Sequence, residues 1–259
     1  MNAELPPAVA EGEATDLLDL DLSAWDVWLS GAVPEEEHWQ EPALDLAILE
    51  FVRDLASLIF SCGGRIVHGS HPSFTPVLMQ QAVEAHERAA RAGAIQPVKP
   101  LSLVVSQFYE TAENHATWKD WESAAEVIRL PVGRMEGQAN RQESLGILRD
   151  ELADRCNAFV AVGGKWWLGK PGQAGVPQEF ERALRRRIPC FIAAGFGGVA
   201  TAYLKQNPGV LGRLENGLTE GENLALAQSK DVSSCAALIV GQLGELRASR
   251  IRSQDELPL

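Results

Sequence analysis

Short unbroken apolar runs alternate along this chain with segments whose apolar residues recur at spacings of three and four. Unbroken runs are typical of strands covered on both faces, and the three-and-four spacing is typical of amphipathic helices. The runs predict strands at 26–30, 65–68, 101–105, 127–130, 158–162 and 189–194, and the periodic segments predict helices at 42–60, 76–92, 140–154, 177–187 and 234–246. Residues 206–230, rich in Gly, Asn and Glu, are expected to be irregular.

The alternation of strands and helices predicts the fold class. Parallel strands joined by right-handed helical crossovers give an α/β, Rossmann-like, doubly wound and mainly parallel sheet with helices on both faces. We expect a single domain at 23–250, an acidic and flexible tail at 1–22, and a short tail at 251–259. In such sheets the ligand crevice lies beyond the carboxyl ends of the strands.

Four of the predicted strands end in glycine-containing turns, which we expect to line one crevice. Glycine lacks a Cβ, so the backbone can adopt positive φ and approach a phosphate, and the following helix N-terminus adds N–H donors and partial positive charge. The turns therefore predict a site for a phosphate-bearing, nucleotide-type ligand. They contribute Ser30, Gly31, Gly69, Ser70, His71, Gly163, Gly164, Gly195, Phe196, Gly197 and Gly198.

Charged residues on the predicted helices add candidates for the same site. Arg141 and Arg149 stand eight positions apart, which places both on one helical face where either guanidinium could bind a phosphate through two hydrogen bonds. His68 and His71 flank a glycine turn without two further ligands near them, so no metal site is predicted, and His68 is expected to be a core residue. The adjacent Trp166 and Trp167 could stack a purine, close over the site, or form an oligomer interface.

Composition limits the partners of the chain. A net charge of −12 disfavours nucleic-acid binding, and the arginines at 182 and 185–187 are interpreted as a solvated helix C-terminus. No apolar run approaches the ~20 residues that span a bilayer, and the N-terminus lacks a secretory pattern, so we expect a cytoplasmic protein without membrane contact. The four cysteines are widely spaced, which argues against a zinc site or a disulfide framework.

Five segments together resemble the SLOG superfamily: SGAVP, GGRIVHGSHPS, AFVAVGGK, GVPQEFERAL and AAGFGG. This Rossmann-like group includes the LOG phosphoribohydrolases and the DprA proteins. LOG enzymes carry a GG turn and then G-T-x-x-E at a helix start; here Gly163-Gly164 matches the first part and 175–179 the second. Two features depart from the LOG pattern. Val176 replaces the threonine, and the linker at 165–174 has ten residues instead of one.

The closer resemblance is to SLOG sensor domains of bacterial antiphage systems, such as that of the Thoeris effector. Those domains bind cyclic ADP-ribose-type signals made by a TIR protein. The resemblance implies that Lys165, after the GG turn, and Glu179 contact the ligand, together with Gly175 and Val176. It also implies that Arg149 lies in the pocket, close to the position at which LOG enzymes carry a helical arginine that assists bond cleavage.

Three functions are compatible with these observations. The first is a sensor of a nucleotide-derived signal that needs no other cofactor and acts through homo-oligomerisation or through an effector or TIR-type partner. The second is a nucleotide or NAD N-glycosidase, in which Glu179 and Arg149 would be catalytic. The third is a scaffold whose pocket has lost its ligand. The sequence does not identify the base or the linkage of the ligand.

Overall fold

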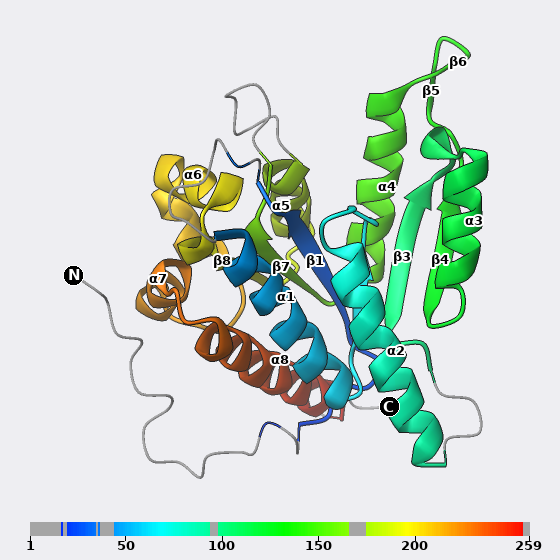
Figure 1. Ribbon diagram of the computed structural model, residues 1–259. Helices are drawn as coiled ribbons and strands as arrows, with labels where there is room; N and C mark the ends of the chain where they lie inside the picture. The colour runs from blue at the N-terminus through cyan, green and yellow to red at the C-terminus, as the bar shows by residue number, and fades with distance from the viewer. Residues whose placement is uncertain are drawn as a thin grey trace.

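A computed structural model describes residues 17, 20–34, 36, 44–93, 98–165 and 175–255. Within these residues six strands form one parallel sheet in the order β4-β3-β2-β1-β7-β8 (Figure 1). Their bounds are Asp26–Ala32 (β1), Arg65–His68 (β2), Leu101–Ser106 (β3), Ala125–Leu130 (β4), Ala158–Gly163 (β7) and Cys190–Ala193 (β8). The predicted Rossmann-like α/β fold is confirmed.

Helices cover both faces of the sheet because successive strand residues point to opposite sides. Val27 and Leu29 of β1 lie in a core with α1, α2 and α8, whereas Trp28 lies in a second core with α4, α5 and α6. Figure 1 shows α1, α2 and α8 gathered on one side of the sheet. The bounds are Leu44–Ser61 (α1), Thr75–Arg91 (α2), Arg141–Arg155 (α4), Gly175–Arg185 (α5), Gly198–Gln206 (α6) and Val232–Asp255 (α8). Each fully buried Leu, Ile or Phe contributes about 1.5–3 kcal/mol to these two cores.

Several elements were not predicted from the sequence. After β3 the chain forms a 3-10 turn, η3 (Gln107–Tyr109), and helix α3 (Ala112–Trp121), and a small hairpin precedes α4, formed by β5 (Arg134–Met135) and β6 (Gln138–Ala139). Helix α3 escaped prediction because only Trp118 of its residues is buried, so the segment has no apolar periodicity. A further 3-10 turn, η5 (Ala194–Phe196), follows β8.

The prediction that residues 206–230 are irregular is wrong. They contain the 3-10 segment η6 (Pro208–Arg213) and helix α7 (Glu220–Gln228). Helix α7 begins with a capping box, in which Thr219 accepts from the backbone of Glu222 and the Glu222 carboxylate accepts from the backbone of Thr219. This T-x-x-E signal was present in the sequence. None of the described helices is long and apolar enough to cross a membrane.

The order of the strands places a switch point between β1 and β7. From β1 the chain adds β2, β3 and β4 on one side, and it then returns to β7 on the other side of β1. Connections that leave neighbouring strands in opposite directions open a crevice at their carboxyl ends. Here Gly31 pairs with Val162 and Ala32 with Gly163. A Cβ on Gly31 would lie 2.1 Å from the Val162 carbonyl oxygen, so the close approach of these two strands requires glycine.

Candidate functional site

A cavity of about 1050 Å³ lies beyond the carboxyl ends of β1, β2, β3 and β7. Its floor is formed by the strand ends at 29–32, 68–72 and 105–106. Helices α4 and α5 supply one wall, and the start of α2 with η3 and α3 supplies the other. The cavity occupies the crevice that the switch between β1 and β7 creates, and its volume is at the upper end of the ~300–1,000 Å³ range of small-molecule sites.

Most residues predicted from the sequence to bind a ligand come together in this cavity. Three of the four glycine turns reach it, and so do all the predicted charged residues of α4, α5 and the turn after β7. The predicted residues that line the cavity are Ser30, Gly31, Gly69, Ser70, His71, Arg141, Arg149, Gly164, Lys165, Gly175, Val176 and Glu179. Those that do not line it are Gly163, Gly195, Phe196, Gly197 and Gly198.

The fourth glycine turn, after β8, supports the site from behind instead of lining it, which corrects the expectation of a single crevice lined by all four turns. Phe196 is 1% exposed and packs against Phe51 with ring centroids 5.3 Å apart. The backbone N–H of Val199, in the first turn of α6, donates to the Gly164 carbonyl oxygen at 3.1 Å. A Cβ on Gly198 would lie 2.5 Å from the backbone of Gly163. These glycines let α6 pack closely on the turn after β7.

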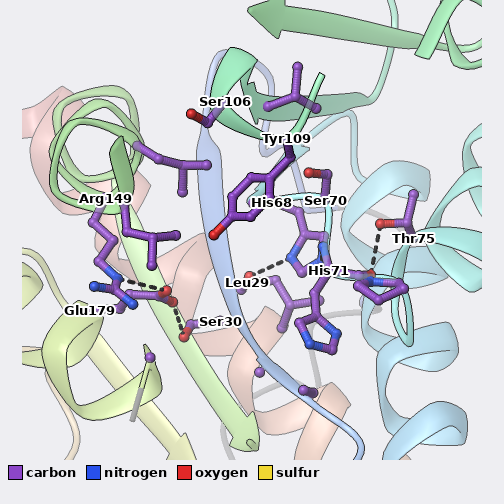
Figure 2. A pocket seen from close by; sticks show the side chains of 18 of the residues that line it. Leu29, Ser30, His68, Ser70, His71, Thr75, Ser106, Tyr109, Arg149 and Glu179 are labelled. Carbon is purple, nitrogen blue, oxygen red and sulfur yellow. Dashed lines mark hydrogen bonds and ion pairs between the residues drawn. The ribbon is translucent and has the colours of Figure 1, made fainter. Parts of the chain in front are cut away.

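A polar network crosses the cavity wall between β1, α4 and α5 (Figure 2). The Ser30 hydroxyl donates to Glu179 Oε2 at 2.5 Å, and Arg149 Nε lies 3.5 Å from Glu179 Oε1. Arg149 Nη1 donates to Gln178 Oε1 at 2.6 Å. Ser30 and Arg149 are buried, so this network holds charged groups away from bulk water at the switch point.

The first turn of α5 contributes to the cavity next to this network. A Cβ on Gly175 would lie 3.6 Å from both Arg149 Nη2 and Glu179 Oε1. This is an ordinary van der Waals distance, so a side chain at this position would touch the pair without a clash. Val176 is buried and packs in the core with Phe180. The position that carries a hydroxyl in the LOG pattern is therefore apolar here.

His68 forms part of the floor but is held in a fixed structural role. Its Nδ1 lies 2.9 Å from the Leu29 carbonyl oxygen, and its Nε2 lies 3.1 Å from the backbone nitrogen of His71. Because a carbonyl only accepts and a backbone N–H only donates, His68 is the neutral tautomer with its proton on Nδ1. Burial lowers the pKa of His68, which favours the same neutral form. His71 lines the cavity, and its Nδ1 lies 2.9 Å from the Ser73 hydroxyl.

The sequence prediction missed the wall formed by η3 and α3. Tyr109, 38% exposed, lines the cavity directly after β3, and its hydroxyl accepts from Arg141 Nε at 3.1 Å. Tyr109 comes directly after the end of a buried strand, and this position was the available signal. The signal was overlooked because that strand end does not carry a glycine. The other polar or aromatic cavity residues that were missed are Thr75, Ser106, Asn114, Thr117, Trp118, Trp121, Gln142 and Gln178.

Three further interpretations of the sequence concern metal binding, the tryptophan pair and the arginines at the end of α5. Among the residues that the structure describes, no group of three His, Cys, Asp or Glu side chains could hold a metal ion. Trp166 and Trp167, interpreted as a stacking platform, lid or interface, lie outside the described residues. Two of the arginines at 182 and 185–187 form ion pairs with α4: Arg182 lies 3.2 Å from Asp150, and Arg186 lies 2.8 Å from Asp154.

The sheet order and the strand ends define a Rossmann-like protein with a cavity at the carboxyl ends of its strands. The sequence profile of SLOG cluster2 matches residues 33–229, which is more than half of the chain. The chain therefore belongs to the SLOG family.

Two solved structures are similar to this chain at low sequence identity. The structural-genomics target TM1055 is 13% identical, with 70% of this chain and 81% of that chain covered and a TM-score of 0.44. DNA processing protein A from Helicobacter pylori, described with its single-stranded DNA binding mode, is 14% identical, with 75% and 76% covered and a TM-score of 0.41. No curated protein matches the chain.

Proposed function

We propose that this chain binds a nucleotide-derived ligand of the ADP-ribose type in the cavity at the switch point and acts as its sensor in a bacterial defence or signalling pathway. The observation that carries the proposal is the combination, in one cavity, of Lys165 and Arg149 with the carboxylate of Glu179. Cations suit a pyrophosphate, and a carboxylate accepts hydrogen bonds from ribose hydroxyls. Membership of the SLOG family supports a ligand of this class.

Lys165 and the residues of the network would divide these tasks. Lys165 follows β7 and the turn of Gly164, whose φ of +96° turns the backbone at the cavity edge. Its ammonium would bind a phosphate as a point charge. Glu179 already accepts from Ser30 and faces Arg149, and a carboxylate has about four lone-pair positions, so it can also accept from a ribose hydroxyl.

The same contacts favour binding over catalysis. An N-glycosidase would use the negative charge of Glu179 to stabilise positive charge that develops on the ribose. Here that charge faces the Arg149 guanidinium, and the buried Val176 offers no hydroxyl to the phosphate. We therefore propose a protein that holds its ligand without cleaving it.

Titration calorimetry with ADP-ribose tests the binding proposal. Wild type should bind, and Lys165→Ala should weaken binding by about 1.5–3 kcal/mol, the contribution of a hydrogen bond to a charged group. Lys205→Ala, an exposed lysine on α6 outside the cavity lining, is the matched control and should bind as wild type does. Absence of ADP-ribose binding to wild type, or equal affinity of wild type and Lys165→Ala, would overturn the assignment.

An N-glycosidase is the second candidate, because the Glu179 carboxylate lies on the cavity wall. Incubation of the purified protein with AMP or NAD, followed by chromatography of free bases, separates the two functions. We expect no released base. Turnover that Glu179→Gln abolishes would replace the sensor with a hydrolase.

The output of the sensor is proposed to be self-association or contact with an effector or TIR-type partner. Light scattering with and without ADP-ribose distinguishes these routes, since the chain has a mass of 28.1 kDa. A ligand-dependent rise in mass supports self-association. A constant monomer mass points to a separate partner protein.

A further inference from the structure

The η3 and α3 wall differs in chemistry from the opposite wall of the same cavity. The side chains that η3 and α3 bring to the lining are Tyr109, Asn114, Thr117, Trp118 and Trp121, none of which is charged. Glu110 and Glu113 are exposed beside them. The part of this wall that η3 and α3 supply is therefore uncharged and largely aromatic at the cavity, which suits a flat uncharged ring.

The Tyr109 ring is held in place before any ligand arrives. Phe108 packs edge-on against it with ring centroids 5.1 Å apart, and Arg141 Nε donates to its hydroxyl. The Asn114 side-chain amide donates to the Tyr109 carbonyl oxygen at 2.6 Å, and the Thr111 hydroxyl caps α3. Figure 2 shows the ring projecting into the cavity. A ring that is fixed in advance loses little conformational freedom when it binds a partner.

The sheet sets the distance between the aromatic wall and Lys165. Tyr109 follows β3 and Lys165 follows β7, and β2 and β1 lie between these strands. Three strand spacings of about 4.8 Å separate β3 from β7 by roughly 14 Å. A single ligand that contacts both Tyr109 and Lys165 must therefore have an extended linker between its ring and the phosphate that lies farthest from the ring. A nucleoside diphosphate derivative has such a linker.

We infer that Tyr109 forms a base-stacking subsite, so that the ligand lies across the strand ends with its base on η3 and its distal ribose phosphate near Lys165. This inference rests on the proposed function and adds the orientation of the ligand. Stacking on an aromatic side chain is worth about 1–3 kcal/mol per base, which corresponds to a change in affinity of about 5- to 150-fold.

Two probes test the subsite, ADP-ribose and ribose 5-phosphate, which has no base. Calorimetry and NMR titration of Tyr109→Ala should show ADP-ribose binding weakened by about 5- to 150-fold and ribose 5-phosphate binding unchanged. Tyr109→Phe keeps the ring and loses only the hydroxyl contact with Arg141, so it should bind ADP-ribose nearly as wild type does. Leu224→Ala, on an exposed position of α7, is the control for a substitution outside the cavity.

Each outcome of this experiment has a distinct meaning. Full ADP-ribose affinity in Tyr109→Ala would overturn the subsite and leave the proposed function standing. Equal weakening of both probes would also overturn it, because the substitution would then act on the whole cavity. If wild type binds neither probe, the proposed function and the subsite fail together.

Discussion

Replacing Glu179 by Gln tests whether the network on the cavity wall stabilises the fold. The substitution preserves the size of the side chain and removes its charge. In the native protein one carboxylate oxygen accepts from the buried Ser30 hydroxyl at 2.5 Å, and the other lies 3.5 Å from Arg149 Nε. The Arg149 side chain is 9% exposed, so it has little water to replace a lost partner.

The expected cost is about 2 kcal/mol. A hydrogen bond to a charged group contributes ~1.5–3 kcal/mol and a neutral one ~0.5–1.5, so the Ser30 contact loses about 1 kcal/mol. Removing one member of a fully buried ion pair costs ~3–5 kcal/mol. The contact between Arg149 Nε and Glu179 Oε1 is long, at 3.5 Å, and Gln178 still accepts from Arg149 at 2.6 Å after the substitution. We therefore assign about 1 kcal/mol to the lost ion pair.

Urea denaturation of single and double variants measures both parts. Glu179→Gln should lower the free energy of unfolding by about 2 kcal/mol in wild type and by about 1 kcal/mol when Arg149→Met has already removed the cation. Glu245→Gln, at an exposed position of α8, is the control and should change stability by less than about 0.5 kcal/mol. An identical cost of Glu179→Gln in both backgrounds would show that the ion pair contributes nothing.

The remaining predictions concern the floor, the helices and the arginines. Burial lowers the pKa of His68 below its ordinary 6.5, so below that pH the unfolded chain binds a proton that the native protein does not. The free energy of unfolding should therefore fall as the pH drops below about 6.5. The fall should be less steep in His68→Asn. Gly31→Ala would place a Cβ 2.1 Å from the Val162 oxygen and should cost about 3 kcal/mol, whereas Gly146→Ala, in open space within α4, should add about 0.5–1 kcal/mol, both measured by thermal denaturation. Single-stranded DNA should not be retained in a filter-binding assay, because the net charge is −12 and Arg182 and Arg186 are paired with aspartates of α4. Salt-sensitive retention would contradict that last expectation.

The fold was predictable wherever burial imposed a pattern. Strands β3 and β7 are buried at every residue and gave unbroken apolar runs, and α1 gave its three-and-four spacing. Helix α3 was missed because it rests on the protein through few buried side chains, and its surface is polar on the remaining sides. Helix α7 was missed although its capping box was visible, because its glycine- and asparagine-rich surroundings favoured an irregular segment.

The site was predictable where local sequence coincides with the ends of strands. Glycine turns identified the region around Ser30 and Gly164, and helical spacing placed Arg141 and Arg149 on the same wall. The turn at Gly195 was assigned to the site because a glycine that faces a ligand and a glycine that faces a packed backbone look alike in sequence. The pairing of Arg149 with Gln178 and Glu179 joins residues about thirty positions apart and depends on how α4 packs on α5.

Helices α4 and α5 share an apolar core, and polar contacts also join them at two places that differ in exposure to water. At the cavity they are joined by the buried Arg149, and outside the cavity lining by the arginine–aspartate pairs at their solvent-exposed ends. Dissolved salt reaches the second fastening and scarcely reaches the first, since exposed ion pairs are screened and buried ones are not. Raising the ionic strength therefore weakens the exposed ion pairs and leaves the contacts of Arg149 and the apolar core that the two helices share. The polar contact between these helices that resists salt is then made by a residue that also lines the cavity.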